Sequence, residues 1–292
     1  MNNDKIILSV ATTGSWPSKL QNPGLPVTPE EIAQAAVESW REGAAVVHVH
    51  VRDEAGKMTC DLSRFQRVKQ LIRAQGCDIL INFTTSGGAG RVDEGERFNS
   101  LTAGPELGSL DAGSMNFNER VFLNPPDFLE ELAGRMLAAN VKPEIEVFDS
   151  GMIGNALTLI QNGLIKPPLW WQFVLGVKGG APATARSLLH LIDSIPAGSL
   201  WSVCAVGWRQ LPMNMLAIAM GGHARTGLED NLYYKRGELA QSNAQLVARL
   251  ARIARECGRE PATPAEAREM LGLVKTGGTG KGSRSRKQRK DG

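Results

Sequence analysis

The chain has 292 residues, of which 42% are hydrophobic and 22% are charged. This composition is typical of a soluble globular protein and excludes a chain that is disordered throughout, while 32 glycines without a fixed period exclude a collagen-like rod. No run of about 18 apolar residues, the length needed to cross a bilayer, occurs in the sequence. The first residues do not resemble a signal peptide and the four cysteines are widely spaced, so we expect free thiols and a cytoplasmic location.

The net charge of +3 is unevenly distributed along the chain. Segment 276–292 holds six Lys or Arg residues and one Asp, a contribution of +5, so residues 1–275 carry −2. Because the segment has no large apolar residue, we expect a basic disordered tail behind a single catalytic domain of residues 1–275. A basic tail can bind nucleic acid through its phosphates, but the acidic domain argues against that partner.

Short apolar runs alternate with helical patterns along residues 1–275. In chain order we expect strand 6–12, helix 29–42, strand 44–52, helix 62–74, strand 78–85, helix 93–101, strand 107–112, helix 127–140, strand 143–148, helix 151–161, strand 169–177, helix 184–195, strand 200–206, helix 212–220, strand 224–228 and helix 242–257.

Eight strand–helix units in about 275 residues predict an α/β fold of the (β/α)8 type, a TIM barrel, which typically takes about 250 residues. Thr28-Pro29-Glu30-Glu31 supports the first helix start, with an N-cap threonine, a proline at the first position and a capping-box glutamate. A doubly wound open sheet is the alternative. It is disfavoured because Thr13–Pro17, after the first strand, is not a glycine-rich dinucleotide turn.

The second expected strand carries His48 and His50. Strand side chains alternate, so the two imidazoles share one face, while Val47, Val49 and Val51 face the helices. In a barrel the histidine face points inward near the carboxyl end of the strand. Two imidazoles two residues apart then form a platform for a metal ion, which we favour over a pair of structural core histidines.

Only four histidines are present, and the other two, His190 and His223, fall in an expected helix and just before the last strand. A binuclear hydrolase-type site would need more ligands, so a single metal completed by a carboxylate fits better. Glu229 and Asp230 follow the last strand, close to Arg225. One acid can bind the metal while the other, oriented by the arginine, serves as general base. The alternative is a carboxylate pair at a helix start.

Polar residues at other strand ends can complete a pocket. Segment 84–88 has hydroxyl groups, including that of Ser86, and backbone N–H groups that suit an anionic oxygen, although it can equally be a plain turn. Ser109 and Asp111 lie on the fourth strand. Glu144 and Glu146 share one face of the fifth, where inward acids require partners, and both catalytic and structural roles remain open for them.

Six segments together resemble the β-keto acid cleavage enzyme family over residues 6–273. They are VTPEEIA (27–33), HVHVRD (48–53), KPEIEVFDSGM (142–152), QFVLGV (172–177), GGHARTGLEDN (221–231) and SNAQLV (242–247). The resemblance implies a zinc-dependent barrel that transfers an acyl group between a β-keto acid and acetyl-CoA and releases acetoacetate. It also implies a homo-oligomer, a tetramer. A zinc lyase or aldolase that acts without CoA is the alternative activity.

The resemblance also implies roles for individual residues. His48, His50 and Glu229 would bind zinc, and Asp230 would be the base, held by Arg225 and Thr85. Ser109 and Gly88 would contact the substrate carboxylate. Thr85 stands where the family pattern has serine, and Ser109 stands where it has threonine. Both changes keep a hydroxyl group. The sequence has no CoA signature, and it therefore names no residues for that co-substrate.

Trp16 departs from the family pattern. A member of the family carries a glutamate there that pairs with a substrate amine, and a neutral indole cannot form that ion pair. We therefore expect a substrate whose distal group is apolar, or is a quaternary ammonium attracted to the ring, as in dehydrocarnitine. The alternative is that Trp16 only plugs the rim of the barrel.

Overall fold

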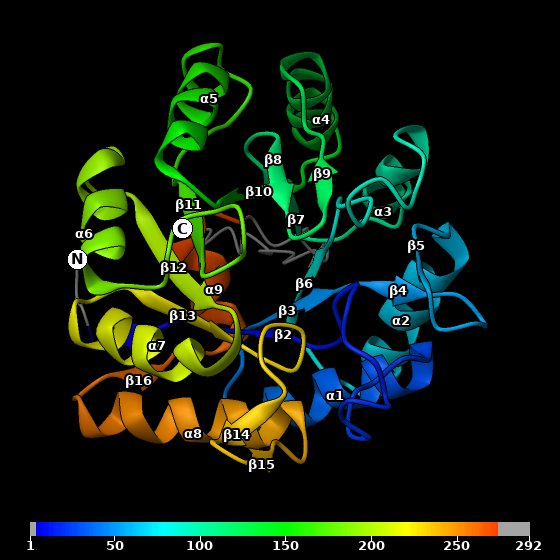
Figure 1. The fold of residues 1–292 in the computed structure, drawn as a ribbon, viewed down its shortest axis with the longest axis vertical. Coiled ribbons are helices and arrows are strands. Elements are labelled where there is room, and N and C mark those ends of the chain that lie inside the picture. The colour runs from blue at the N-terminus through cyan, green and yellow to red at the C-terminus, as the bar shows by residue number, and fades with distance from the viewer. Residues whose placement is uncertain (1–3, 274–292) are drawn as a thin grey trace, which may run out of the picture.

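Eight parallel strands close into a barrel in the computed structural model, which describes residues 4–273 (Figure 1). The barrel confirms the predicted fold, and each strand lies within one residue of its expected range. The tail predicted at 276–292 lies outside the described residues. The barrel strands are β2 (Leu8–Ala11), β3 (Val46–Val49), β6 (Leu80–Phe83), β7 (Leu107–Asp111), β10 (Lys142–Val147), β11 (Trp170–Leu175), β12 (Leu200–Ala205) and β13 (His223–Thr226).

A ring of helices surrounds the barrel in chain order (Figure 1). The helices are α1 (Pro29–Arg41), α2 (Leu62–Ala74), α3 (Asn99–Thr102), α4 (Pro126–Ala138), α5 (Ser150–Gln161), α6 (Ala185–Ser194), α7 (Gln210–Ala219) and α8 (Asn243–Glu256). The helix expected at 93–101 is shorter than predicted, because a 3₁₀ turn, Gly95–Phe98, precedes α3. No helix within residues 4–273 combines the length and the apolar character needed to span a membrane.

The predicted capping box starts α1. The Thr28 hydroxyl accepts the Glu31 N–H at 3.2 Å, and the Glu31 carboxylate accepts the Thr28 N–H at 3.1 Å. Each cap satisfies an N–H group that the helix itself leaves unpaired, a contribution of about 1 kcal/mol. These bonds define where the chain leaves the first strand-to-helix loop.

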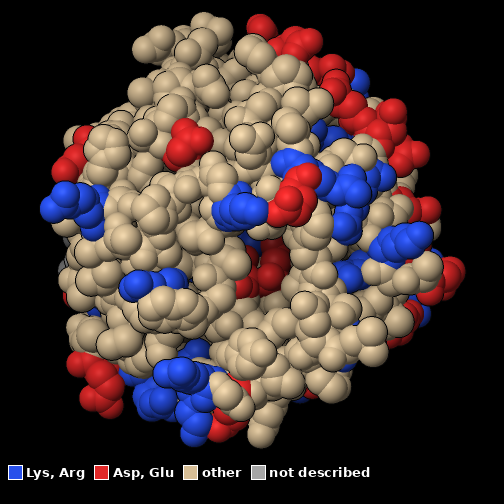
Figure 2. All heavy atoms as spheres, viewed as in Figure 1, with Lys and Arg blue, Asp and Glu red and all other residues tan. Residues whose placement is uncertain are grey.

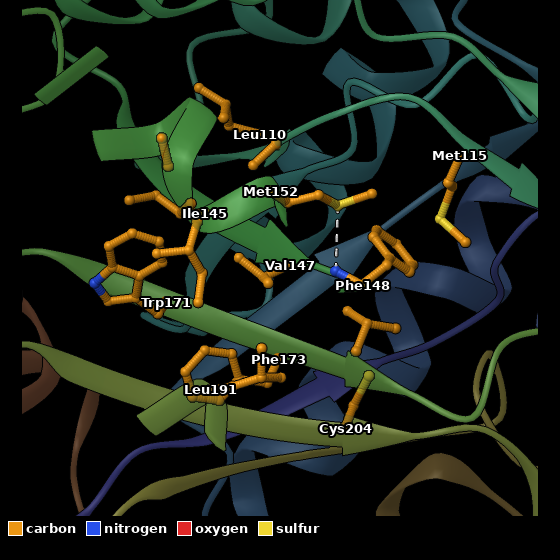
Figure 3. Packing of buried hydrophobic residues seen from close by; sticks show 14 of the residues in the cluster. Leu110, Met115, Ile145, Val147, Phe148, Met152, Trp171, Phe173, Leu191 and Cys204 are labelled. Atoms are coloured by element: carbon orange, nitrogen blue, oxygen red, sulfur yellow. Dashed lines mark hydrogen bonds between the residues drawn. The ribbon is translucent and has the colours of Figure 1, made fainter. Parts of the chain in front are cut away.

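The outer faces of the strands pack under the helices. Figure 3 shows Ile145 of β10 and Trp171 and Phe173 of β11 in the same buried cluster as Met152 of α5 and Leu191 of α6. Around β3, Val47, Val49 and Val51 pack with residues of α1 and α2, as alternation predicts. Burial of one such side chain contributes roughly 1.5–3 kcal/mol.

The amino-terminal end of the barrel is closed by a helix that we did not predict, α9 (Pro264–Met270). Its Ala267, and Leu271 just beyond it, pack with the inward residues Ile7, Val46 and Trp170. A further capping box, Thr263 with Glu266, starts this helix. The apolar plug fills this end of the barrel, opposite the carboxyl ends of the strands.

Short two-stranded ribbons supplement the barrel. At the carboxyl ends of the strands they extend the loops that surround the site, and a parallel pair joins the two ends of the described chain. They are β4 (Val51–Arg52) with β5 (Met58–Thr59), β8 (Met115–Phe117) with β9 (Arg120–Phe122), β14 (Tyr233–Lys235) with β15 (Glu238–Leu239), and β1 (Lys5–Ile6) with β16 (Glu260–Pro261).

Candidate active site

A cavity of about 410 Å³ opens at the carboxyl ends of the barrel strands. Figure 2 shows a hollow in the middle of this face, with acidic atoms at its bottom. The acidic residues that line the cavity are Asp111, Glu146, Glu229 and Asp230. His48, His50 and Arg225 line it as well, so the structure brings the predicted metal and base residues into one pocket.

The two histidines face Glu229, as the sequence predicted. Glu229 Oε1 lies 3.7 Å from His48 Nε2 and 3.4 Å from His50 Nε2. Burial is the main cause that lowers the pKa of His48 well below its usual value, so its imidazole is neutral and keeps a free lone pair. The Ser15 hydroxyl lies 3.1 Å from His50 Nδ1 and orients the ring through the nitrogen that does not face Glu229. This role of Ser15 was not predicted from the sequence, because it depends on the packing of the first loop against β3.

The spacing of these atoms fits a divalent metal ion. Two ligands that are each about 2.1 Å from a tetrahedral zinc lie roughly 3.4 Å apart. The second oxygen of Glu229, Oε2, is buried and has no hydrogen-bond partner among residues 4–273. Burial tends to raise the pKa of Glu229, but His50, Arg225 and His48 together lower it, so the carboxylate is ionised. The residues present therefore fit such an ion, with positions left for substrate.

A second group of possible ligands, His48, Glu144 and Glu146, lies deeper in the barrel. Both oxygens of Glu144 already accept hydrogen bonds, from Asn82 Nδ2 at 2.6 Å and from Trp170 Nε1 at 2.8 Å. Glu144 is thus a structural acid, paired as an inward carboxylate must be. Glu146 instead lines the cavity and pairs with Arg225 at 3.1 Å, so the two acids of this strand differ in role.

Arg225 connects three of the four acids that line the cavity. Its guanidinium donates to both oxygens of Asp230 at 3.1 Å, to Glu229 at 2.6 Å and to Glu146 at 3.1 Å. Burial raises the pKa of Asp230, an effect that Arg225 opposes and Glu229 supports, and the resulting value is about 6. A carboxylate with such a pKa is a stronger base than an exposed one and is still ionised at neutral pH.

Thr85 does not reach Asp230. Its hydroxyl donates to the Ser109 carbonyl at 2.7 Å, and its N–H donates to the Ser109 hydroxyl at 3.0 Å. Both residues are buried and neither lines the cavity. In this structure Thr85 bonds to Ser109 and not, as expected, to Asp230, because alternation along the chain turns Thr84 into the cavity and Thr85 toward the neighbouring strand.

Ser86 and Gly88 line the cavity as expected. The Gly88 N–H donates to the Ser86 hydroxyl at 3.1 Å, so the loop is internally bonded. Gly88 has a φ of +61°, a backbone conformation that favours glycine, and an added Cβ would lie 2.6 Å from Met58 Sδ and displace that side chain.

Trp16 lies at the rim of the cavity and is 41% exposed. Its ring stacks on Phe117 with 6.0 Å between centroids and 12° between planes. The Arg91 guanidinium lies 4.0 Å from the ring centroid and donates to the Ser15 carbonyl at 3.3 Å. Phe122, on the β8–β9 ribbon, and Phe148, just after β10, extend this wall. The sequence did not single out Phe122, because nothing in it places this ribbon over the barrel.

The chain is similar to known enzymes over nearly its whole length. The chain is 42% identical to 3-keto-5-aminohexanoate cleavage enzyme of Fusobacterium nucleatum, with 93% of this chain and 99% of the relative covered. It is 40% identical to 3-oxoadipate:acetyl-CoA acetyltransferase of Cupriavidus necator, with coverage of 91% and 94%. It is 34% identical to 3-dehydrocarnitine:acetyl-CoA trimethylamine transferase of Rhizobium meliloti, with coverage of 94% and 98%.

A solved structure, the ternary complex of ObcA with C4-CoA adduct and oxalate, has a TM-score of 0.72 and 23% identity, and the match covers 86% of this chain and 68% of that one. This likeness shows a shared fold. The model of the beta-keto acid cleavage enzyme family matches residues 5–273, nearly the whole described chain. The protein is thus an enzyme that belongs to the β-keto acid cleavage enzyme family.

Proposed function

We propose that the chain is a zinc-dependent β-keto acid:acetyl-CoA acyltransferase that releases acetoacetate. The observation that carries the proposal is the position of Asp230. This base candidate and the ligand candidate Glu229 share one arginine, Arg225, at the floor of one cavity. The acetyl-CoA named for two of the relatives supports it as co-substrate.

His48, His50 and Glu229 are the proposed zinc ligands. Zinc at this position supplies Lewis acidity to a carbonyl oxygen of the substrate, which acidifies the C2 protons of a β-keto acid. Asp230 accepts one C2 proton on a carboxylate oxygen, while Arg225 keeps that carboxylate oriented. No covalent enzyme nucleophile is needed for this chemistry, which suits a cavity lined by acids and aromatic residues.

Ser86 and Gly88 are proposed to contact the substrate carboxylate, since both line the cavity. Ser109 does not line the cavity and is proposed to position this loop, because its hydroxyl accepts the Thr85 N–H at the start of the loop. Thr85 is thereby a positioning residue in place of the contact with Asp230 that the sequence suggested.

The distal group of the substrate is proposed to be uncharged and apolar. Trp16, Phe117, Phe122 and Phe148 form an aromatic wall of the cavity. Arg91 already lies against the Trp16 ring, so a quaternary ammonium there would face a positive charge at short range. Of the two substrate types expected from the sequence, the apolar one fits this wall.

The function is tested by incubating purified protein with acetyl-CoA and a panel of β-keto acids and measuring acetoacetate. We expect release only when both substrates are present, loss of turnover after prolonged chelation, and recovery with zinc. Unabated cleavage without acetyl-CoA would instead identify the lyase or aldolase. We also propose a homotetramer, for which light scattering coupled to gel filtration is the test.

A further inference from the structure

The rim of the cavity beyond β12 and β13 carries a highly exposed aromatic ring on a loop that reaches the site. Val206 and Gly207, which follow β12, line the cavity, as does Tyr233 at the start of β14. The Gly207 N–H donates to the Asp230 carbonyl at 2.8 Å, which ties this loop to the proposed base. The next residue, Trp208, is 72% exposed, an unusual position for so large an apolar ring.

Unneutralised positive charge lies beside this ring. The Arg209 guanidinium is 3.9 Å from the centroid of the Trp208 ring. Neither Arg209 nor Arg236, at the turn of the β14–β15 ribbon, forms an ion pair with any residue between 4 and 273, whereas Lys235 pairs with Glu238 at 2.9 Å. The turn Gly207–Arg209 and β14 lie next to each other, so the two arginines belong to neighbouring loops.

The position of these loops in the barrel adds a second argument. β12 and β13 are the seventh and eighth strands of the barrel, and the loops after these two strands often form the phosphate-binding site of TIM barrels. An exposed aromatic ring beside cations is also the combination that binds a nucleotide, since the base stacks on the ring and the phosphates pair with the cations.

We propose that this surface binds the adenosine 3′-phosphate 5′-diphosphate part of CoA. Adenine stacks on Trp208, and the phosphates contact Arg209 and Arg236. The pantetheine arm enters the cavity between Val206 and Tyr233 and brings the thioester toward Asp230. The inference rests on the proposed function, from which it takes acetyl-CoA as co-substrate, and it adds the residues that hold it.

The test measures both nucleotide binding and turnover. Adenosine 3′,5′-bisphosphate is titrated by calorimetry into the wild type and into Trp208→Ala, Arg209→Ala and Arg41→Ala. Arg41 is the matched control, an exposed arginine at the far end of α1. Loss of one stacked ring should raise the Kd of the nucleotide and the KM for acetyl-CoA about tenfold. The KM for the β-keto acid should stay unchanged, and Trp208→Phe should retain most of the affinity.

Three results that contradict the proposal have different meanings. If the wild type turns over but the Trp208 and Arg209 variants keep its KM for acetyl-CoA, the site is wrong and the proposed function stands. If those variants also change the oligomeric state in gel filtration, the surface is a contact between copies of the chain. If the wild type neither binds CoA nor turns over with acetyl-CoA, the proposed function itself fails.

Discussion

Asn82 donates a 2.6 Å hydrogen bond to Glu144 in the middle of the barrel, and this bond determines which way the amide faces. A carboxylate only accepts, so Nδ2 of Asn82 points to Glu144 and Oδ1 points away. Oδ1 of Asn82 and Nδ1 of His48 are both buried without a hydrogen-bond partner in the described chain, and the two residues are paired in register between β3 and β6. A proton on Nδ1 would satisfy both atoms and leave Nε2 for the metal.

Asn82→Leu should therefore weaken metal binding. Loss of the group that hydrogen-bonds the second ring nitrogen of a metal-binding histidine typically lowers metal affinity 10- to 100-fold. Competition with a chromogenic chelator measures this affinity. The double variant Asn82→Leu/Glu144→Gln removes the buried charge that the single change leaves with Trp170 as its remaining hydrogen-bond donor. It should regain thermal stability but not metal affinity. Equal zinc affinity in wild type and variants would show that Asn82 does not position His48.

His48→Ala should give a folded protein without bound metal and without turnover, because the imidazole is one of the three proposed ligands at the site. His190→Ala is the control, since His190 is exposed on α6. Elemental analysis, melting temperature and acetoacetate release are measured on both. Normal turnover of the His48 variant would show that the proposed site is wrong.

Asp230→Asn should keep the metal but lose the base. General-base catalysis typically contributes 10²- to 10⁴-fold, so we expect kcat to fall by about that factor. Exchange of the substrate C2 proton with deuterated water, followed by NMR, should slow with it. Asp193→Asn, an exposed change on α6, is the control. Unchanged C2 exchange in the Asp230 variant would assign the base to another group.

Trp16→Glu should broaden the substrate range toward amines. The new carboxylate lies at the cavity rim, where it can pair with a primary ammonium, whereas the wild type should prefer β-keto acids with an apolar distal group. The ratio of kcat/KM for the two substrate types is measured, with Trp16→Phe as a control that keeps the aromatic wall. A wild-type preference for the amine would refute the role of Trp16.

His223 should make stability depend on pH. It is buried and accepts the Ile7 N–H through Nδ1, and burial, aided by Arg259, lowers its pKa from 6.5 to about 3. Below pH 6.5 this histidine binds a proton in the unfolded chain but stays neutral in the folded chain, so the free energy of unfolding falls as the pH falls. Between pH 7 and pH 5 the loss is about 2 kcal/mol. His223→Asn keeps an acceptor but does not titrate, so urea unfolding of that variant should show a smaller pH dependence.

Much of the barrel could be predicted from local patterns. The strands are buried on both faces and several of the helices between them have side-chain caps, so the alternation of apolar runs with helical patterns located all eight strands. The same alternation placed His48 and His50 on the inner face, and the acids after the last strand supplied the third ligand candidate. Helix α9 was missed, because seven residues beyond the last expected unit give too little periodicity.

The sequence by itself determined the number of strand–helix units, the pairing of the two histidines on one strand face and the family of the chain, because all three depend on residues close to one another in the chain. The tertiary structure alone decided that Thr85 bonds to Ser109 instead of Asp230, that Glu144 and Glu146 divide into structural and cavity acids, and that Arg225 joins three carboxylates. These contacts depend on the register between neighbouring strands and on the path of each loop over the barrel, which residues far apart in the chain set together.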